Sequence, residues 1–527
     1  MTALRVTSVA LACLFVGIAC NGRSDKPARR VVVIGWDGAS FRSIDPLVAA
    51  GRLPNVQRLL ERGTSARLRS TIIPISSAAW AGAVTGKHPG QTGVYSFFEP
   101  VPGSTEVSLV SSKSVRAAPI WRILTGHEKR SIVFGVPITY PPEKIDGVMV
   151  SGMLAPFEAD YAHPPEYAEE LRSRGFVPDL GIWRENQPAS LERFDTQLEI
   201  KRDAVLELLG DDDWDLAWIV FKSLDVMKHR VYRGPTEEPV ASHYEKLDRV
   251  LGDILDQVGE DTDVLLISDH GFKTYRLMFN LHAWLLQEGF SVPRAANDDD
   301  AAARDADLAS RRASEHKRRM ESLDLAKTKA FATACEGHFG SLRLNLAGRD
   351  HTEATETTRD ALTEIAARLR ALKDPVSGKA IMREVIETKD LYPGPYLDRI
   401  PDLVFEVDPR YLVSSAQSDR VFARMPAPRP DHDRNGIFIA AGPGCEPSTE
   451  RGEREIFDVA PTVLHLLGLP VYQEMNGAVA LTSSTVQRIA EASDAKYVAE
   501  RPADRRRTSE SDEDEVRQRL KDLSYTE

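Results

Sequence analysis

Carboxylate and imidazole side chains stand at the end of a predicted buried strand near the middle of the chain. Within Asp263–Phe272, read DVLLISDHGF, the apolar run Val264–Ile267 is followed by Asp269, His270 and a glycine. A short apolar run without polar alternation is typical of a strand buried on both faces of a parallel sheet. Acidic and imidazole groups just past such a strand suit a divalent metal site at the carboxyl edge of an α/β sheet. The glycine permits the turn that both side chains need to reach one ion.

Two further apolar runs end in the same way. Arg30–Gly35, read RVVVIG, leads to Asp37, and Leu216–Phe221, read LAWIVF, leads to Asp225 and His229. On a helical turn the last two residues are i,i+4 neighbours on one face, which makes a workable pair of metal ligands. In isolation Asp37 could be only a turn aspartate, and Asp225 and His229 could form only a surface ion pair. Their shared placement after predicted sheet strands favours a metal site.

A serine pair stands before a helix of small residues. Ser76 and Ser77 precede Ala78–Thr85, which is predicted to be helical. Either serine could serve only as the N-cap of that helix. A serine at a helix N-terminus near cations could instead act as a nucleophile, because the helix dipole and a metal would together stabilise its alkoxide. The residues by themselves leave both interpretations open.

The composition is typical of a soluble protein, and the chain is too long to form only one small core. The chain has 527 residues, of which 42% are hydrophobic and 28% are charged. This length predicts one large domain with insertions, or two domains. The net charge of -12 argues against binding to a nucleic-acid backbone. Past Cys20 the chain has only Cys335 and Cys445, and we expect no disulfide between these two.

The N-terminus predicts an export signal. Arg5 precedes the apolar run Val6–Ile18, which is short for a membrane span and typical of a signal-peptide core. Small residues then lead to Cys20, as in a bacterial lipobox, where cleavage exposes a cysteine that becomes lipidated. Gly17 stands where that motif prefers leucine, so plain secretion stays an alternative. We expect residues 1–20 to be a signal peptide, the protein to be periplasmic or in the cell envelope, and Cys20 to carry its only membrane anchor.

An ordered set of motifs resembles that of the alkaline phosphatase superfamily. The motifs are GWDG at Gly35–Gly38, SSAAW at Ser76–Trp80, TGKHPG at Thr85–Gly90, SDHG at Ser268–Gly271 and DVAPTVLHLLGLP at Asp458–Pro470. The chain is most similar to the type I phosphodiesterase/nucleotide pyrophosphatase branch and to bacterial phosphohydrolase and phosphomutase relatives. The resemblance implies an α/β fold, alkaline-phosphatase-like, with a mostly parallel central sheet flanked by helices and with inserted cap segments.

The resemblance also implies a site for two divalent metal ions per chain. One ion would be held by Asp37, Asp269, His270 and the oxygen of Ser76, and the other by Asp225, His229 and His432. Without the resemblance, His432 would be interpreted as a loop histidine. Such ligands suit zinc first, with manganese as an alternative. The resemblance further implies that Ser76 attacks phosphorus to form a phosphoseryl intermediate, which water then hydrolyses.

The expected enzyme is a metal-dependent phosphoric ester hydrolase that acts on a small phosphorylated substrate. Eukaryotic-type nucleotide pyrophosphatases have asparagine where this chain has Ala79, and close bacterial relatives often have histidine where it has Thr92. Both departures leave open whether the substrate is a diester, a nucleotide or a monoester. A phosphomutase or phosphonate-ester hydrolase is an alternative. A lipid-anchored binding protein without catalysis is another, which the complete set of metal-site residues disfavours.

The expected catalytic domain covers residues 30–481, with cap insertions near 157–191 and 293–373 that would choose the leaving group. Residues 482–527 are expected to be a charged tail with a short helix at Ser509–Leu523. Further strands are predicted at Ser131–Val136 and Ile437–Ala441. Further helices are predicted at or within Ile44–Gly63, Val115–Gly126, Leu191–Leu209, Tyr244–Val258, Asn280–Glu288 and Thr357–Lys373.

Overall fold

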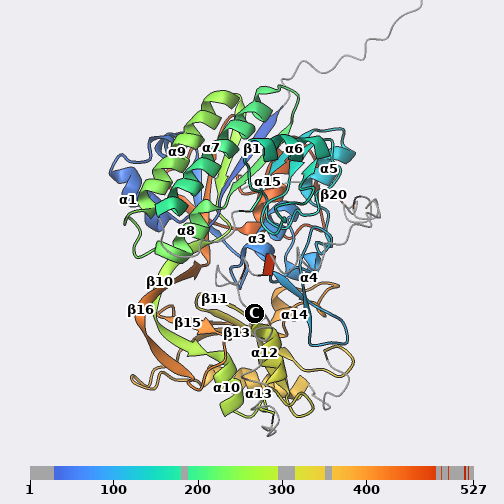
Figure 1. Ribbon diagram of the computed structural model, residues 1–527, viewed down its shortest axis with the longest axis vertical. Helices are drawn as coiled ribbons and strands as arrows, with labels where there is room; N and C mark the ends of the chain where they lie inside the picture. The colour runs from blue at the N-terminus through green and yellow to red at the C-terminus, as the bar shows by residue number, and fades with distance from the viewer. Residues whose placement is uncertain are drawn as a thin grey trace, which may run out of the picture.

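The computed structural model shows two lobes joined by two long strands (Figure 1). It describes residues 29–179, 188–294, 315–350 and 359–481, together with 488–489, 497, 516–517 and 520. The larger lobe, at the top of Figure 1, contains a nine-stranded sheet, and the smaller lobe contains a four-stranded and a three-stranded sheet. Strands β10 (Gly271–Asn280) and β16 (Phe422–Asp433) run between the lobes.

The central sheet has the strand order β18-β2-β17-β9-β1-β8-β5-β6-β7. Its middle strands are all parallel: β9 (Thr262–Ile267), β1 (Arg30–Trp36), β8 (Leu216–Phe221), β5 (Ser131–Phe134) and β6 (Gly147–Val150). Antiparallel strands flank this block, β17 (Asn435–Ala441) at one side and β7 (Ala162–His163) at the other. Beyond β17 lie β2 (Thr64–Arg69) and β18 (Arg451–Glu455). Every residue of β8 and β9 is buried, as their apolar sequences predict.

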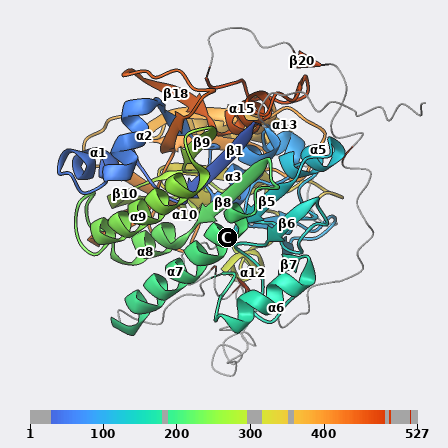
Figure 2. The same ribbon diagram turned by 90° about the horizontal axis from the view of Figure 1, so that it is seen from above.

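Helices cover both faces of this sheet, as the view from above in Figure 2 shows. One face packs against α3 (Ser76–Thr85), α5 (Ile120–Gly126) and α15 (Val459–Leu466). The other packs against α1 (Phe41–Ala49), α2 (Pro54–Arg62), α6 (Pro165–Ser173), α7 (Pro188–Gly210), α8 (Ser223–Val231) and α9 (Val240–Val258). Alternate residues of β1 serve the two cores, because successive side chains of a strand point to opposite faces. The predicted fold class is therefore confirmed.

The smaller lobe has a hydrophobic core of its own, which includes Phe279, Trp284 and Phe405. Its sheets have the orders β11-β12-β14-β13 and β15-β10-β16. The further strands are β11 (Ala330–Glu336), β12 (Phe339–Leu344), β13 (Met382–Glu387), β14 (Leu403–Val407) and β15 (Tyr411–Ser414). The helices are α10 (Leu281–Gln287), α12 (Glu315–Glu321), α13 (Arg359–Arg370) and α14 (Thr388–Leu391). Residues 293–373, expected as a cap insertion, contribute β11, β12, α12 and α13 to this lobe.

Short elements complete the described part of the chain. They are α4 (Pro89–Thr92), η2 (Ile456–Asp458), the pair β3 (Phe98–Pro100) and β4 (Val107–Leu109), and the pair β19 (Val471–Tyr472) and β20 (Arg488–Ile489). The segment 157–191, also expected as a cap, forms β7 and α6 and begins α7. The helical pattern expected within 44–63, interrupted at Gly51 and Pro54, corresponds to α1 and α2, which are separated by a turn at Gly51 with a φ of 71°.

Some expectations fall outside the described residues. The predicted signal peptide at residues 1–20 is one, and the predicted helix Ser509–Leu523 is another, except for Val516, Arg517 and Leu520. Of the helices that the structure describes, none has both the length and the apolar character of a membrane span. Among the described residues, Cys335 and Cys445 form no disulfide with each other.

Candidate active site

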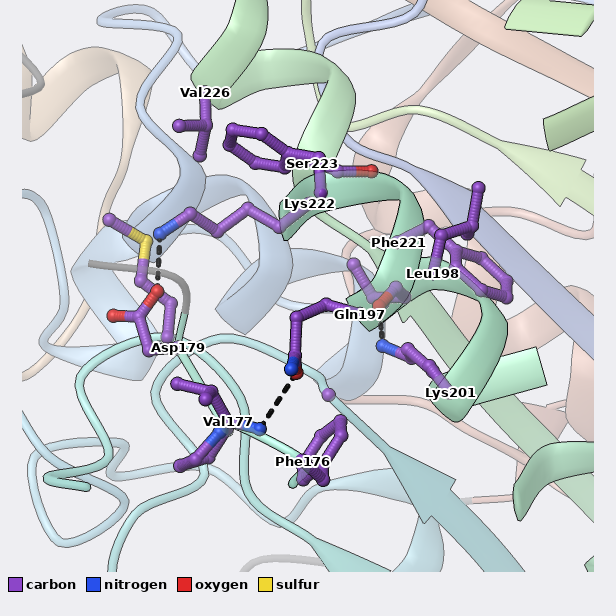
Figure 3. A pocket seen from close by; sticks show the side chains of 15 residues that line it. Phe176, Val177, Asp179, Gln197, Leu198, Lys201, Phe221, Lys222, Ser223 and Val226 are labelled. Carbon is purple, nitrogen blue, oxygen red and sulfur yellow. Dashed lines mark hydrogen bonds and ion pairs between the residues drawn. The ribbon is translucent and has the colours of Figure 1, made fainter. Parts of the chain in front are cut away.

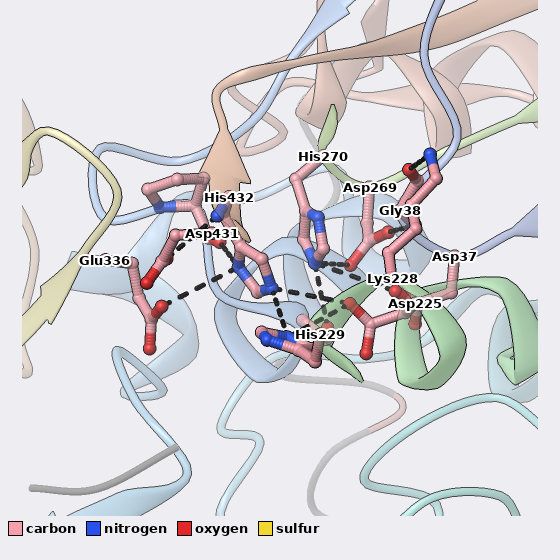
Figure 4. Close-up of polar contacts among 12 residues, drawn as sticks. Asp37, Gly38, Asp225, Lys228, His229, Asp269, His270, Glu336, Asp431 and His432 are labelled. Atoms are coloured by element: carbon pink, nitrogen blue, oxygen red, sulfur yellow. Dashed lines mark hydrogen bonds and ion pairs between the residues drawn. The ribbon is translucent and has the colours of Figure 1, made fainter. Parts of the chain in front are cut away.

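Three adjacent strands deliver the predicted ligands to one edge of the central sheet (Figure 4). Strand β1 lies between β9 and β8 and runs parallel to both, with Gly35 beside Ile267 and Val220. The carboxyl ends of the three strands therefore meet. Asp37 follows β1, Asp269 and His270 follow β9, and helix α8 carries Asp225 and His229 just after β8.

The sixth side chain, His432, lies on β16, one of the two strands that connect the lobes. Strand β10 begins directly after His270 and pairs antiparallel with β16, so that Phe272 lies opposite His432. The imidazole rings of His270 and His432 are stacked with their centroids 3.7 Å apart. The structure thus brings all seven predicted site residues, Ser76 included, into one cluster; their roles remain a prediction.

One group of donors surrounds the Nε2 atom of His270. This atom lies 3.6 Å from Asp37 Oδ1, 3.2 Å from Asp269 Oδ2 and 3.1 Å from Ser76 Oγ. The two carboxylates and the imidazole offer donor atoms that all lie within 4.8 Å of one another. Asp37, Asp269 and His270 are completely buried. A single cation at this position would be in reach of all four side chains.

A second group adjoins the first. Asp225 Oδ1 lies 3.4 Å from the Nε2 atoms of both His229 and His432, and these two nitrogens are 3.0 Å apart. Asp225 and His432 also form a compact donor group with His270. The two predicted ligand sets are therefore contiguous.

Backbone carbonyls select the histidine tautomer that a metal requires. The Nδ1 atom of His432 is 2.6 Å from the carbonyl oxygen of Pro74, and that of His270 is 3.3 Å from the carbonyl oxygen of Gly271. A carbonyl oxygen only accepts hydrogen bonds, so Nδ1 carries the proton in both rings. The Nε2 atoms of both rings then face the carboxylates, which is the side a metal-ligating histidine presents to an ion.

Two buried carboxylates of this site, Asp37 and Asp269, each have an oxygen without a hydrogen-bond donor among the described residues. Asp37 Oδ1 and Asp269 Oδ2 have no hydrogen-bond partner among the described residues. Burial, and then repulsion from Asp269 and Asp225, raise the pKa of Asp37 well above its usual range. Burial, and then repulsion from Asp225, raise the pKa of Asp269 to about 7. Divalent cations would offset both the repulsion and the missing hydrogen bonds. The donor set therefore fits the metal ions that the motifs imply.

Helix α3 places Ser76 against this cluster. The helix begins at Ser76, and its N-cap is Ile75, without a side-chain cap. The alternative in which Ser76 or Ser77 serves only as the N-cap is therefore wrong. Ser76 Oγ instead contacts His270, whereas Ser77 Oγ is buried without a hydrogen-bond partner in the described part of the chain. Only the first hydroxyl is directed at the donor cluster.

Side chains that the sequence did not single out support the ligands. The indole Nε1 of Trp80, one turn into α3, donates to Asp37 Oδ2 at 3.1 Å. The Lys228 ammonium is buried on α8 and donates to the carbonyl of Gly38 and to the Tyr244 hydroxyl, both at 2.8 Å. Burial lowers the pKa of Lys228 to about 7. The motif SSAAW contains Trp80, but nothing local in the sequence marks Lys228 as a neighbour of the site.

A pocket opens beside the cluster at the carboxyl ends of β5 and β8 (Figure 3). Helix α8 joins the two, because Ser223 and Val226 line the pocket while Asp225 belongs to the ligand cluster. The opposite wall is the stretch Phe176–Asp179, part of the segment expected as a cap. Lys222 Nζ donates to Asp179 Oδ1 across the pocket at 2.7 Å.

The comparison with protein families agrees with this geometry. The model of the family named type I phosphodiesterase/nucleotide pyrophosphatase matches residues 31–435, which is most of the chain. The chain belongs to this family. As a member of this alkaline phosphatase superfamily branch, it is a phosphoric ester hydrolase, and family members use a two-metal site. The family resemblance and the enzyme class expected from the motifs are thereby confirmed. No curated protein matches the sequence.

Solved structures share the fold at low sequence identity. Phosphonoacetate hydrolase from Sinorhizobium meliloti 1021, in complex with phosphonoacetate, is 16% identical with a TM-score of 0.56, covering 84% of this chain and 96% of that one. An inactive variant of murine ectonucleotide pyrophosphatase/phosphodiesterase 5, in complex with AMP, is 14% identical with a TM-score of 0.51, covering 86% and 98%. The human form of that protein is also 14% identical with a TM-score of 0.51, covering 86% and 100%.

Proposed function

We propose that the protein is a two-metal phosphodiesterase or phosphatase in which Ser76 is the nucleophile. The observation that carries this proposal is the contact of Ser76 Oγ with His270 Nε2 at 3.1 Å, within a buried cluster of carboxylates and imidazoles. Asp37, Asp269, His270 and Ser76 would hold one ion, and Asp225, His229 and His432 the other. Carboxylate and imidazole donors favour zinc, with manganese next.

The bound ions would supply Lewis-acid stabilisation of the charge on the reacting oxygens. The chain itself provides the rest. Ser76 Oγ forms a bond to phosphorus as the bond to the leaving oxygen breaks, which gives a phosphoseryl intermediate. Water then attacks phosphorus and releases Ser76, so that each turnover consumes one water molecule. The free N–H groups at the start of α3 favour negative charge at this position.

Buried hydrogen bonds keep the carboxylates in place during these steps. Trp80 donates to Asp37 Oδ2, and the backbone N–H of Gly38 donates to Asp269 Oδ1 at 3.3 Å. Each leaves the other carboxylate oxygen facing His270. Such outer partners fix the orientation of ligands and raise their affinity for a metal.

The substrate is proposed to be a small organic phosphate whose leaving group enters the pocket beside α8. The pocket is lined mostly by apolar side chains, together with the charged pair Lys222 and Asp179. Such a lining suits a leaving group with both apolar and polar parts. Ala79 has no amide to bind a phosphate oxygen, so the chain relies on other donors there. A panel of diesters, monoesters, nucleotides and phosphonates would identify the preferred class.

Metal content together with hydrolysis of bis-p-nitrophenyl phosphate tests the proposal. We expect two zinc or manganese ions per chain, and turnover that a chelator abolishes and added metal restores. Bound metal without turnover of any ester in the panel would favour the non-catalytic binding protein instead. Turnover that persists after complete metal removal would contradict the two-metal site.

We also propose that the protein is exported and anchored in the cell envelope through Cys20. The support is the N-terminal apolar run followed by small residues and a cysteine. Wild-type protein should take up labelled palmitate and fractionate with the envelope, and Cys20→Ser should do neither. Equal labelling of both proteins, with both in the cytosol, would contradict the proposal.

A further inference from the structure

A tight turn of the smaller lobe touches the backbone of His432. The turn consists of Glu336, Gly337 and His338 and connects β11 to β12. It is buried and lies behind the imidazole of His432, on the side away from the other ligands (Figure 4). Glu336 Oε2 comes within 3.9 Å of His432 Nδ1. The turn belongs to none of the motifs that point to the active site.

Gly337 makes the closest approach of the turn. Its N–H donates to Asp431 Oδ1 at 3.0 Å, and the same oxygen accepts the N–H of His432 at 2.8 Å. A Cβ atom at Gly337 would lie 2.2 Å from the carbonyl oxygen of His432, which is far inside contact distance. Its φ of 58° also lies in the region that favours glycine. Only glycine allows the two backbone segments to approach this closely.

Tyr275 completes the contact from β10. Its hydroxyl lies 2.8 Å from the carbonyl oxygen of His432 and 3.0 Å from Nδ1 of His338. The carbonyl only accepts, so the tyrosine O–H donates its hydrogen bond there, and the same oxygen accepts a hydrogen bond from the Nδ1–H of His338. The backbone of His432 is therefore held through its N–H by Asp431 and through its carbonyl by Tyr275. The turn of the smaller lobe fixes both of these partners.

We propose that the turn Glu336–His338, acting with Tyr275, positions His432 and so sets the metal affinity of one ligand set. The set concerned is that of Asp225, His229 and His432. The turn touches neither the metal nor the substrate, so its residues are positioning residues. The set around Asp37 and Asp269 has no contact with the turn and should be unaffected. This inference rests on the proposed two-metal function.

Gly337→Ala and Tyr275→Phe test the inference, each with a matched control. Gly378→Ala has the same kind of backbone cost, since Gly378 has a φ of 68° and nothing within 4 Å of its added Cβ. Tyr161→Phe removes the same kind of bond, from a buried tyrosine hydroxyl to the carbonyl of Ala168 at 3.1 Å, and neither residue belongs to the ligand cluster. Differences within each pair therefore report the contact with His432 rather than general destabilisation.

Zinc affinities are measured on the full chain by competition with a chromophoric chelator. We expect both test variants to keep one zinc at wild-type affinity and to bind the second about 10- to 100-fold more weakly. Excess zinc should restore their turnover. The visible spectrum of the cobalt-substituted protein should change in the test variants and not in the controls, because it reports the ligand geometry.

Three outcomes would overturn the inference. Test variants could bind both zinc ions as tightly as their controls do, or lose both ions to the same extent, or fail to recover activity in excess zinc. If Gly337→Ala does not fold, Tyr275→Phe decides the question. A wild-type protein that holds fewer than two metal ions would overturn the proposed function, and this inference with it. Failure of the inference alone leaves the wild type with two ions and full turnover.

Discussion

Replacing Trp80 by phenylalanine should weaken metal binding at the set around Asp37. The Trp80 indole is fully buried and donates to Asp37 Oδ2 at 3.1 Å, so the change removes one hydrogen bond to an ionised group. Such a bond contributes about 1.5–3 kcal/mol. At about 1.4 kcal/mol for each factor of ten, the affinity for zinc at this set should fall about 10- to 100-fold.

Trp218→Phe is the matched control for this change. Trp218 on β8 is equally buried, and its Nε1 has no hydrogen-bond partner in the described structure. Both variants lose the same atoms from the core, so their cavity costs are comparable, whereas only Trp80→Phe leaves a carboxylate without its donor. Chelator competition and the zinc dependence of kcat/KM would be measured for both. Equal affinities in the two variants would refute the claim that Trp80 orients Asp37 for a metal.

Two further predictions concern the second ligand set and the pH dependence of stability. Asp225→Ala and His229→Ala should each lower the zinc content from two ions to one and reduce turnover by several powers of ten, because the ligand sets are disjoint; a content that stays at two would rule out the assignment. Burial lowers the pKa of His243 and of His282 to about 4. Between pH 6.5 and pH 4 the unfolded chain binds a proton at each histidine and the folded protein does not, so the folded protein should lose stability as the pH falls through this range. At pH 5 this is about 2 kcal/mol for each group, so urea unfolding of His282→Gln should show a pH 7 to pH 5 difference about 2 kcal/mol smaller than wild type; an unchanged difference would contradict the burial argument.

The strands that carry the ligands were predictable because they are buried on both faces. Runs such as RVVVIG and LAWIVF have no polar alternation, and they form β1 and β8 with nearly the predicted ends. Buried strands of this kind carry their signal in local sequence. The carboxylates that follow β1, β8 and β9, which are Asp37, Asp225 and Asp269, could be predicted for the same reason.

The place of His432 could not be predicted from its surroundings. It depends on the pairing of β10 with β16, two strands more than a hundred residues apart in the chain, whose register no local pattern specifies. Only the resemblance to a known family pointed to this histidine. The smaller lobe was likewise expected only as inserted cap segments, since its strand β12 pairs with β14, more than fifty residues further along the chain. The turn at Gly337 has no sequence signature beyond its glycine.

The N-cap interpretation of the serine pair shows how a local rule loses to tertiary structure. Serine before a run of alanines is a common N-cap pattern. Here the helix begins at Ser76, two residues before Ala78, and the hydroxyl of Ser76 contacts His270 instead of capping the helix. Ser77, the next residue, provides an internal comparison because its hydroxyl makes no hydrogen bond among the described residues.

Trapping of the phosphorylated enzyme tests the central claim most directly. The full chain, loaded with zinc, is mixed briefly with a phosphate ester substrate, quenched in acid and digested, and the modified peptide is identified by mass spectrometry. We expect phosphate on Ser76, no trapped phosphate and no turnover in Ser76→Ala, and near-normal behaviour in Ser77→Ala. Ser76→Ala should still fold and bind metal through the remaining side chains. Phosphate on Ser77, or wild-type turnover by Ser76→Ala, would contradict the mechanism.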